Sequence, residues 1–244
     1  MKKFFLILSF MVFSTAAFSQ VLITLLLGDK LNSDKLKFGL EGGMNWATIS
    51  GLETSESARF FNLGFYFDIH LKNQWRLYTG TLVKANLGVD KLTTADLELL
   101  KGNIYGTKGN YKQISNTFLV PIFLKYDFKN NIYLEAGPQL GLNYKDFIEF
   151  TSNENGTESR IRQFNDDMFH KIDGGLALGC GYTFLKGKGV TIGAKYYHGL
   201  TEVYKGLPDT RNRSFNLKAN IRIGAKKAEA RRNNQNVKTN QENN

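Results

Sequence analysis

The chain has 244 residues with a single cysteine, three histidines and a net charge of +10. One cysteine excludes an internal disulfide framework, and so few cysteines and histidines exclude a Cys/His zinc centre. The mean hydropathy of -0.31 and the lack of an apolar run of about 20 residues exclude a polytopic helical membrane protein, but not one that crosses with strands.

The first residues have the parts of a secretory signal peptide over 1–19. Lys2 and Lys3 precede an apolar stretch over 4–13, and Ala17-Phe18-Ser19 is a small-x-small site, so we expect cleavage between Ser19 and Gln20. The stretch is too short to anchor the chain in a bilayer. Export argues against nucleic acid as a partner, in spite of the basic charge.

Residues 20–36 begin with a short apolar run and are then interrupted by Gly28-Asp29 and Asn32-Ser33-Asp34. We expect them to form a periplasmic N-terminal segment.

From residue 37 onward, apolar and polar side chains alternate with a period of two, which is typical of half-buried strands. Every second residue from Phe61 to Leu71 is apolar, for example. Eight segments carry the pattern: 37–47, 61–71, 75–88, 114–128, 132–144, 170–184, 190–200 and 214–225.

The connections between these segments are alternately short and long. The short ones are 72–74, 129–131 and 185–189, and the long ones are 48–58, 89–113, 145–169 and 201–213. Short periplasmic turns, long external loops and an even strand count are typical of outer-membrane barrels. We therefore predict an all-β fold over residues 37–225, an eight-stranded antiparallel up-and-down transmembrane β-barrel with both termini in the periplasm.

The distribution of side chains fits this prediction. If the apolar face of each strand faces lipid, nearly all strand glycines point into the barrel, where eight strands leave room only for packed side chains. Outward aromatic residues collect at the strand ends, as interfacial girdles do. The expected periplasmic girdle is Phe38, Trp75, Phe128 and Phe184, and the external one is Trp46, Phe61, Tyr144, Tyr196 and Phe215. A barrel filled in this way has no wide pore.

Charged residues on the inward face are expected to pair in a polar network inside the barrel. Its predicted members are Glu41, Asp68, Arg76, Lys84, Lys125, Glu135, Lys195, Lys218 and Arg222. The turn at 129–131 brings Lys125 opposite Glu135, and the turn at 72–74 brings Arg76 opposite His70, with Asp68 on the diagonal. We interpret this network as structural, rather than as a proton relay or a catalytic pair.

Two of the long loops contain patterns of their own. Residues 93–100 are predicted to be helical, with Thr93 as N-cap and Asp96 at the third helical position. The loop over 145–169 alternates around a turn at 153–156, which predicts a hairpin above the membrane.

The two ends of the predicted barrel differ in charge. The four long loops together carry a net charge of -3, whereas the short turns contain Lys72, Lys129, Lys186 and Lys188. Residues 226–244 are expected to form a disordered basic tail on the same side as these lysines. This side would suit anionic headgroups or an acidic periplasmic protein, unless the lysines are simply solvated.

Several strand motifs resemble those of the PorT-like outer-membrane β-barrel proteins of the Bacteroidetes. They are FGLEGG at 38–43, LVPIFLKY at 119–126, LEAGPQLG at 134–141, DGG at 173–175, GCGY at 179–182 and KYYHGLT at 195–201. The resemblance covers most of residues 36–225. It implies an eight-stranded outer-membrane barrel without known enzymatic activity, and the family's namesake is linked to protein secretion across the outer membrane. The last strand departs from the common outer-membrane pattern because it does not end in an aromatic residue.

A catalytic set at the external rim would draw on His170, His198, Asp173, Ser115 and Ser214. No spacing joins these residues into a triad, so we expect no catalytic, cofactor or metal site.

The expected function is therefore a non-enzymatic structural or interaction role in the cell envelope, with assistance to protein secretion as one specific form. The expected partners are outer-membrane lipids and a periplasmic or envelope protein. The alternatives are a lipid-modifying barrel enzyme and a soluble lipocalin-like carrier.

Overall fold

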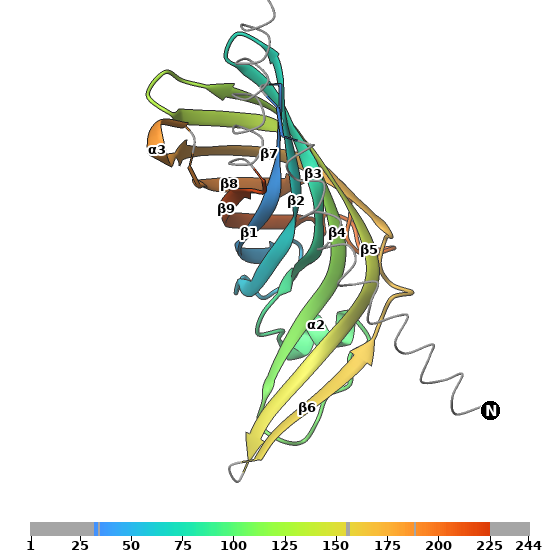
Figure 1. Ribbon diagram of the computed structural model, residues 1–244. Helices are drawn as coiled ribbons and strands as arrows, with labels where there is room; N and C mark the ends of the chain where they lie inside the picture. The colour runs from blue at the N-terminus through green and yellow to red at the C-terminus, as the bar shows by residue number, and fades with distance from the viewer. Residues whose placement is uncertain (1–31, 34, 155–156, 188, 225–244) are drawn as a thin grey trace, which may run out of the picture.

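The computed structural model describes residues 32–33, 35–154, 157–187 and 189–224 (Figure 1). The expected signal peptide over 1–19, most of the segment over 20–36 and the tail over 226–244 lie outside the described residues. Among the described residues, none of the helices has the length and apolar character needed to cross a membrane.

The described residues form nine strands and two short helices. They are β1 (Leu36–Ile49), β2 (Ala58–Lys72), β3 (Trp75–Val89), α2 (Thr94–Leu99), β4 (Asn110–Asp127), β5 (Ile132–Glu154), β6 (Thr157–Phe164), β7 (Ile172–Thr183), α3 (Phe184–Gly187), β8 (Thr191–Gly199) and β9 (Asn212–Arg222). The helix α3 lies in the third of the predicted short turns.

Eight of these strands form a closed ring in the order β1-β2-β3-β4-β5-β7-β8-β9, and β9 pairs back with β1. Every neighbouring pair in the ring is antiparallel. The predicted fold, an eight-stranded up-and-down barrel, is therefore confirmed.

The strand β6 lies outside the ring and extends the sheet above it. β5 pairs with β7 over Ile132–Leu142 and, further along the chain, with β6 over Phe147–Glu154. In Figure 1 the hairpin of β5 and β6, with β4 beside β5, projects past the rest of the ring at the lower end of the view. The predicted hairpin within 145–169 is confirmed.

The outer wall of the ring is apolar and its interior contains the polar groups. Along β5, the exposed Leu134 and Leu140 alternate with the buried Tyr133, Glu135 and Gln139. The same alternation holds in the other strands of the ring. This arrangement is that of a membrane barrel, whose outer surface contacts hydrocarbon.

The strand β3 contains an irregularity that the sequence pattern did not predict. Its pairing with β4 shifts between Leu82 and Ala85, so that two residues, Val83 and Lys84, stand against a single position of β4. Such a β-bulge inverts the alternation of side chains beyond it. Ala85 and Leu87 are buried as a result, and Lys84 is exposed. The prediction that Lys84 faces the barrel interior is therefore wrong.

The long loops pack together into an apolar cap above the ring. Its buried core consists of Ile49, Val89, Leu92, Leu97, Leu100, Ile148, Phe169, Val203 and Tyr204. These residues come from the three ring strands β1, β3 and β5 and from the segments after β3, β6 and β8, so burial of their side chains holds the loops in one folded unit.

The helix α2 contributes to this cap and has the N-terminus predicted for it. The Thr93 side chain accepts a hydrogen bond from the backbone N–H of Asp96, and the Asp96 carboxylate accepts one from the backbone N–H of Thr93. Asp96 also accepts hydrogen bonds from the backbone N–H groups of Glu53 (2.7 Å) and Thr54 (3.1 Å) in the loop after β1. One capping carboxylate thus ties two loops together.

Candidate functional site: the barrel interior and the external rim

A layer of aromatic side chains fills the middle of the barrel. Tyr66, Tyr78, Phe123 and Tyr197 are buried there around Ala177. The rings of Tyr66 and Tyr78 stack with centroids 5.7 Å apart, and those of Tyr78 and Phe123 with centroids 6.2 Å apart. Towards the external end the packing continues with apolar residues, Ala47, Phe60, Leu82, Leu87 and Leu119 among them. The interior is therefore a packed core rather than a channel.

One ionic cluster occupies the interior towards the short turns. Asp68 of β2 accepts a hydrogen bond from the Arg76 guanidinium, and its second oxygen lies 2.8 Å from the Lys125 ammonium. The Lys125 ammonium also lies 3.3 Å from a carboxylate oxygen of Asp127. Asp68, Arg76 and Lys125 are all buried, and each charge has an opposite partner, as a low-dielectric interior requires.

A second ionic cluster joins strands that are not neighbours in the ring. The Lys218 ammonium of β9 lies 2.6 Å from a carboxylate oxygen of Glu135 of β5. The same ammonium lies 4.1 Å from the ring centroid of Tyr78, whose hydroxyl donates to Glu41 of β1. These contacts link β1, β3, β5 and β9 across the interior.

Three further residues were predicted to lie in the interior: Lys195, Arg222 and Lys84. The Lys195 ammonium donates to the side-chain oxygen of Gln139 at 3.0 Å. Arg222, together with Lys37 and Tyr133, lines a cavity of about 10 Å³ between the two clusters, which has room for about one water molecule. Lys84 is the exception described above and lies on the outer wall.

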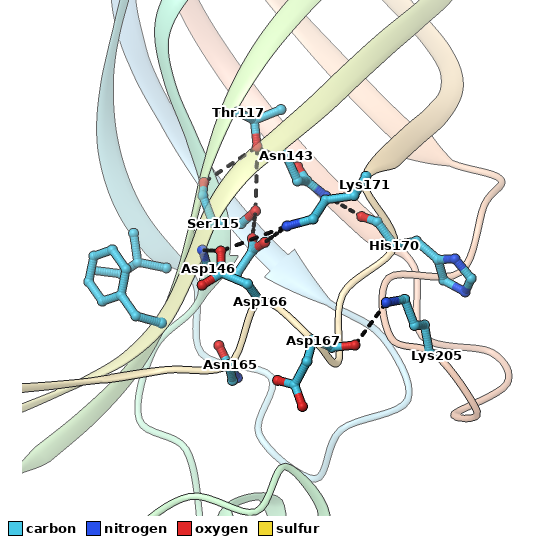
Figure 2. A network of polar contacts seen from close by, with 12 residues as sticks. Ser115, Thr117, Asn143, Asp146, Asn165, Asp166, Asp167, His170, Lys171 and Lys205 are labelled. Carbon is cyan, nitrogen blue, oxygen red and sulfur yellow. Dashed lines mark hydrogen bonds and ion pairs between the residues drawn. The ribbon is translucent and has the colours of Figure 1, made fainter.

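A third polar cluster lies at the rim of the ring that carries the long loops, outside the membrane-spanning part of β5 (Figure 2). Asp146 is buried there and accepts a hydrogen bond from the Ser115 hydroxyl, while its backbone N–H donates to Asp166 at 2.9 Å. The Lys171 ammonium lies 4.0 Å from Asp146 and 3.8 Å from Asp166. Burial raises the pKa of the Asp146 carboxyl to about 6, although the Ser115 hydrogen bond and the Lys171 charge oppose this change.

The serine and the carboxylate of this cluster have no histidine beside them. Figure 2 shows the His170 imidazole pointing away from Ser115 and Asp146. The residue contributes its backbone carbonyl instead, which accepts a hydrogen bond from the Asn143 amide at 3.0 Å. A Ser-His-acid relay needs the imidazole between the two other groups.

The other rim candidates are occupied by structural contacts. Asp173 accepts hydrogen bonds from the Tyr197 hydroxyl at 2.5 Å and from the Asn212 amide at 3.0 Å. The Ser214 hydroxyl oxygen accepts one from the Asn216 amide at 3.0 Å. Within the described part of the chain, no group of three or more His, Cys, Asp or Glu side chains could hold a metal ion.

The sequence did not predict the cluster around Asp146. The β4–β5 pairing shifts between Asn116 and Thr117, so that Tyr144 and Lys145 stand where a regular strand would have one residue. This second bulge inverts the alternation and turns Asp146 inward. The single-sequence pattern shows that Asp146 and Ser115 are close to the rim, but it contains no sign of the bulge that brings them together.

The match to a protein family agrees with this architecture. Residues 24–205 match the family model described as outer membrane protein beta-barrel domain. Ail, the attachment invasion locus protein of Yersinia pestis, solved with the heparin analogue sucrose octasulfate, is 14% identical. That similarity covers 77% of this chain and 98% of Ail, with a TM-score of 0.42. Neisserial surface protein A is 13% identical over 77% of this chain and 97% of its own, with a TM-score of 0.41.

A comparison with curated proteins gave no match. The family model, by contrast, spans well over half of the chain, from 24 to 205. The chain therefore belongs to the outer membrane protein β-barrel domain family and is a protein of the outer membrane.

Proposed function

We propose that this protein is a non-enzymatic, PorT-like envelope protein that acts through contacts of its external cap and of its periplasmic face. The observation that carries the proposal is the packed barrel interior. Aromatic rings and paired charges fill it, which leaves no path for a solute. The surfaces at the two ends are then the parts available for recognition. The strand motifs at 38–43, 119–126 and 134–141 support the PorT-like assignment.

The external surface is well suited to hold a partner. The cap is a folded unit with its own core, and the hairpin of β5 and β6 extends from it. Ile161 and Phe164 of β6 are exposed, although both are large and apolar. Exposed apolar side chains on a rigid projection are typical of interaction sites. We propose an envelope protein as the partner of this hairpin.

The opposite end would face the periplasm, with both termini on that side. Its turns contain the exposed Lys72 and Lys129. An acidic periplasmic protein would complement these charges, and a component of a protein-secretion machine is the specific partner that the PorT-like resemblance suggests.

Site-specific photocrosslinking in intact cells tests the proposal. A photoreactive residue at Ile161 or at Lys129 should give a discrete protein adduct, whereas one at Leu178, on the lipid-facing wall, should give lipid adducts. Deletion of the protein should leave secreted proteins in the periplasm if the secretion role holds. The absence of protein adducts at both Ile161 and Lys129, or solute conductance of the purified protein in planar bilayers, would refute the proposal.

The alternative is a lipid-modifying barrel enzyme, and the hydrogen bond between Ser115 and Asp146 is the observation in its favour. Lipid A and phospholipid turnover in purified outer membranes decides between the two. Lipid turnover that is lost in Ser115→Ala, His170→Ala or His198→Ala would establish the enzyme. We expect no turnover in the wild-type protein.

A further inference from the structure

A small cavity lies inside the barrel near the short turns, with a volume of about 10 Å³. Among the described residues, its lining contains four basic side chains and two carboxylates, which gives it a formal excess of two positive charges. The basic residues are Lys37, Lys125, Lys218 and Arg222, and the acidic ones are Asp68 and Glu135. Two further cations and two further carboxylates beside this lining cancel each other. They are Arg76, Lys195, Glu41 and Asp127.

The two carboxylates of the lining already have cations of their own. Both oxygens of Asp68 bond within the first ionic cluster, and Glu135 is paired with Lys218. Lys37 stands opposite Asp68 in the β1–β2 pairing, but it forms no ion pair with a described residue. The Lys37 charge therefore adds to the excess, and an excess of charge in a low-dielectric interior is costly unless a counter-ion compensates it.

Three hydroxyl-bearing side chains line the same cavity. Tyr133 is 1% exposed, and its hydroxyl has no hydrogen-bond partner among the described residues. Its ring centroid lies 4.6 Å from the Lys125 ammonium and 5.8 Å from the Lys218 ammonium. The hydroxyl oxygens of Thr183 and Thr191 lie 3.0 Å apart, so a hydrogen bond between them uses one of their two protons. The lining thus offers the O–H groups of Tyr133 and of one threonine to an acceptor.

We propose that this cavity binds a chloride ion, held by the excess cations of the lining and by the Tyr133 hydroxyl. A halide accepts hydrogen bonds from ammonium, guanidinium and hydroxyl groups, and hydrogen bonds to a charged acceptor are the strong ones. The volume admits an occupant of about the size of one water molecule. Phosphate, sulfate and carboxylate ions are too large for this space, whereas a halide is compact enough once the flexible lysine side chains adjust.

A water molecule is the neutral alternative for this space. It would donate to the side-chain oxygen of Asn220, a buried acceptor of the lining that has no hydrogen-bond partner among the described residues. Water would leave the excess of two positive charges as it is, whereas one chloride ion halves it. The charge balance therefore favours the anion.

The position of the cavity suits an ion that enters from one end and does not cross the barrel. Lys37 and Arg222 lie at the short-turn ends of β1 and β9 and are partly exposed. On the other side, the aromatic layer around Ala177 closes the interior. The inference needs only the barrel and does not depend on the protein contacts proposed above.

Bromide can replace chloride in such a site and is visible by anomalous X-ray scattering. Crystals of the protein grown in sodium bromide should show an anomalous peak within the cavity, next to Lys37 and Tyr133. The second measurement is urea unfolding in lipid vesicles while sodium chloride replaces sodium gluconate at constant ionic strength. The unfolding midpoint of the wild-type protein should rise with the chloride concentration, because the ion binds only the folded barrel.

Three variants show whether the cavity causes this rise. Lys37→Met removes one of the excess charges and should abolish the rise with chloride. Tyr133→Phe keeps every charge and should need about tenfold more chloride for the same rise, because it loses one hydrogen bond to the ion. Lys129→Met, in an exposed turn at the same end of the barrel, is the matched control and should respond to chloride as wild type does.

A cavity that contains only water, without an anomalous peak, would overturn the proposal. So would an equal chloride response of wild type and Lys37→Met. Heat-modifiable electrophoretic mobility shows whether each variant forms the barrel. If Lys37→Met does not, Tyr133→Phe decides, and a chloride response equal to that of wild type would overturn the proposal. Photocrosslinking at Ile161 should be the same in all folded variants, which separates this inference from the one on protein contacts.

Discussion

The Lys125 ammonium bonds to Asp68 of β2, two strands away, although Glu135 stands directly opposite Lys125 in the β4–β5 pairing. Glu135 is paired instead with Lys218 of β9. Both ion pairs therefore connect strands that share no backbone hydrogen bonds. Backbone pairing holds each strand to its neighbours, and these ion pairs add connections across the interior.

Breaking the second of these pairs should strongly destabilise the barrel. Lys218→Met leaves the Glu135 carboxylate buried without its cation, and the loss of one partner of a buried pair costs about 3–5 kcal/mol. Urea unfolding of the protein in lipid vesicles measures this change. Adding Glu135→Gln to Lys218→Met should recover most of the loss, because no unpaired charge then remains. A double variant no more stable than Lys218→Met would contradict this account.

Two adjacent glycines at the barrel seam should differ strongly in their tolerance of the same substitution. A Cβ atom at Gly43 would lie 2.1 Å from the backbone oxygen of Leu217 in β9, whereas at Gly42 the nearest atom, on Leu63, is 3.8 Å away. Gly43→Ala must push β1 and β9 apart and should cost at least about 1–3 kcal/mol. Gly42→Ala is the control and should change stability by less than about 0.5 kcal/mol. Heat-modifiable electrophoretic mobility gives the folding yield of each variant, and urea unfolding gives its stability. Equal results for the two variants would contradict the close approach of Gly43 to the Leu217 backbone.

Asp146 should make the external cap more stable in acid. Its ordinary pKa is 3.8 and burial raises the pKa to about 6 in the folded cap, so the folded form binds the proton more readily than the unfolded one. The resulting contribution is present in full below about pH 4 and is lost as the pH rises through about 6. Solvent screens part of this interaction, so the difference should amount to about 1–2 kcal/mol.

Hydrogen-exchange protection factors in the β5–β6 hairpin measure this dependence. Wild-type protection should increase as the pH falls from about 7 to about 4, while Asp146→Asn should show high protection throughout, since it has no proton to gain. A wild-type cap that loosens on acidification would rule out the role of this carboxyl.

Asp96 should hold the loop after β1 without affecting the barrel. Its carboxylate accepts three backbone hydrogen bonds, from Glu53, Thr54 and Thr93, and Asp96→Ala would leave these N–H groups without their acceptor. Each buried donor left unpaired costs about 1–3 kcal/mol, so the amides of Glu53 and Thr54 should exchange faster with solvent. Asp96→Asn keeps one acceptor oxygen and should have a smaller effect. Barrel stability in urea should be the same in all three proteins.

The fold could be predicted from the sequence because a membrane barrel imposes a strict rule on every strand. Each outward position contacts hydrocarbon, so the period of two is visible in every segment, and the connection lengths then define the two ends. The helix at α2 was predictable for a local reason, since Thr93 and Asp96 form the capping box by themselves.

The bulges were not predictable because they depend on pairing between strands. Val83-Lys84 and Tyr144-Lys145 fit a regular alternation as well as a bulged one, and only the neighbouring strand decides between them. The cluster around Asp146, on which the predicted pH dependence of the cap rests, follows from the second of these bulges. The partners of the interior charges were missed for a related reason. The strand register indicates which residues lie opposite each other. The long side chain of Lys125, however, reaches the carboxylate of Asp68, two strands away.

The first and last strands of the ring form its seam, with β1 and β9 paired over Gly39–Ile49. Ring closure therefore has to wait until the ribosome has made the whole chain and the secretion apparatus has delivered it to the periplasm. Until then β1 has an unsatisfied edge, which hydrocarbon does not tolerate and which invites aggregation in water. A truncated chain that ends before Asn212 lacks β9 and therefore cannot close the ring.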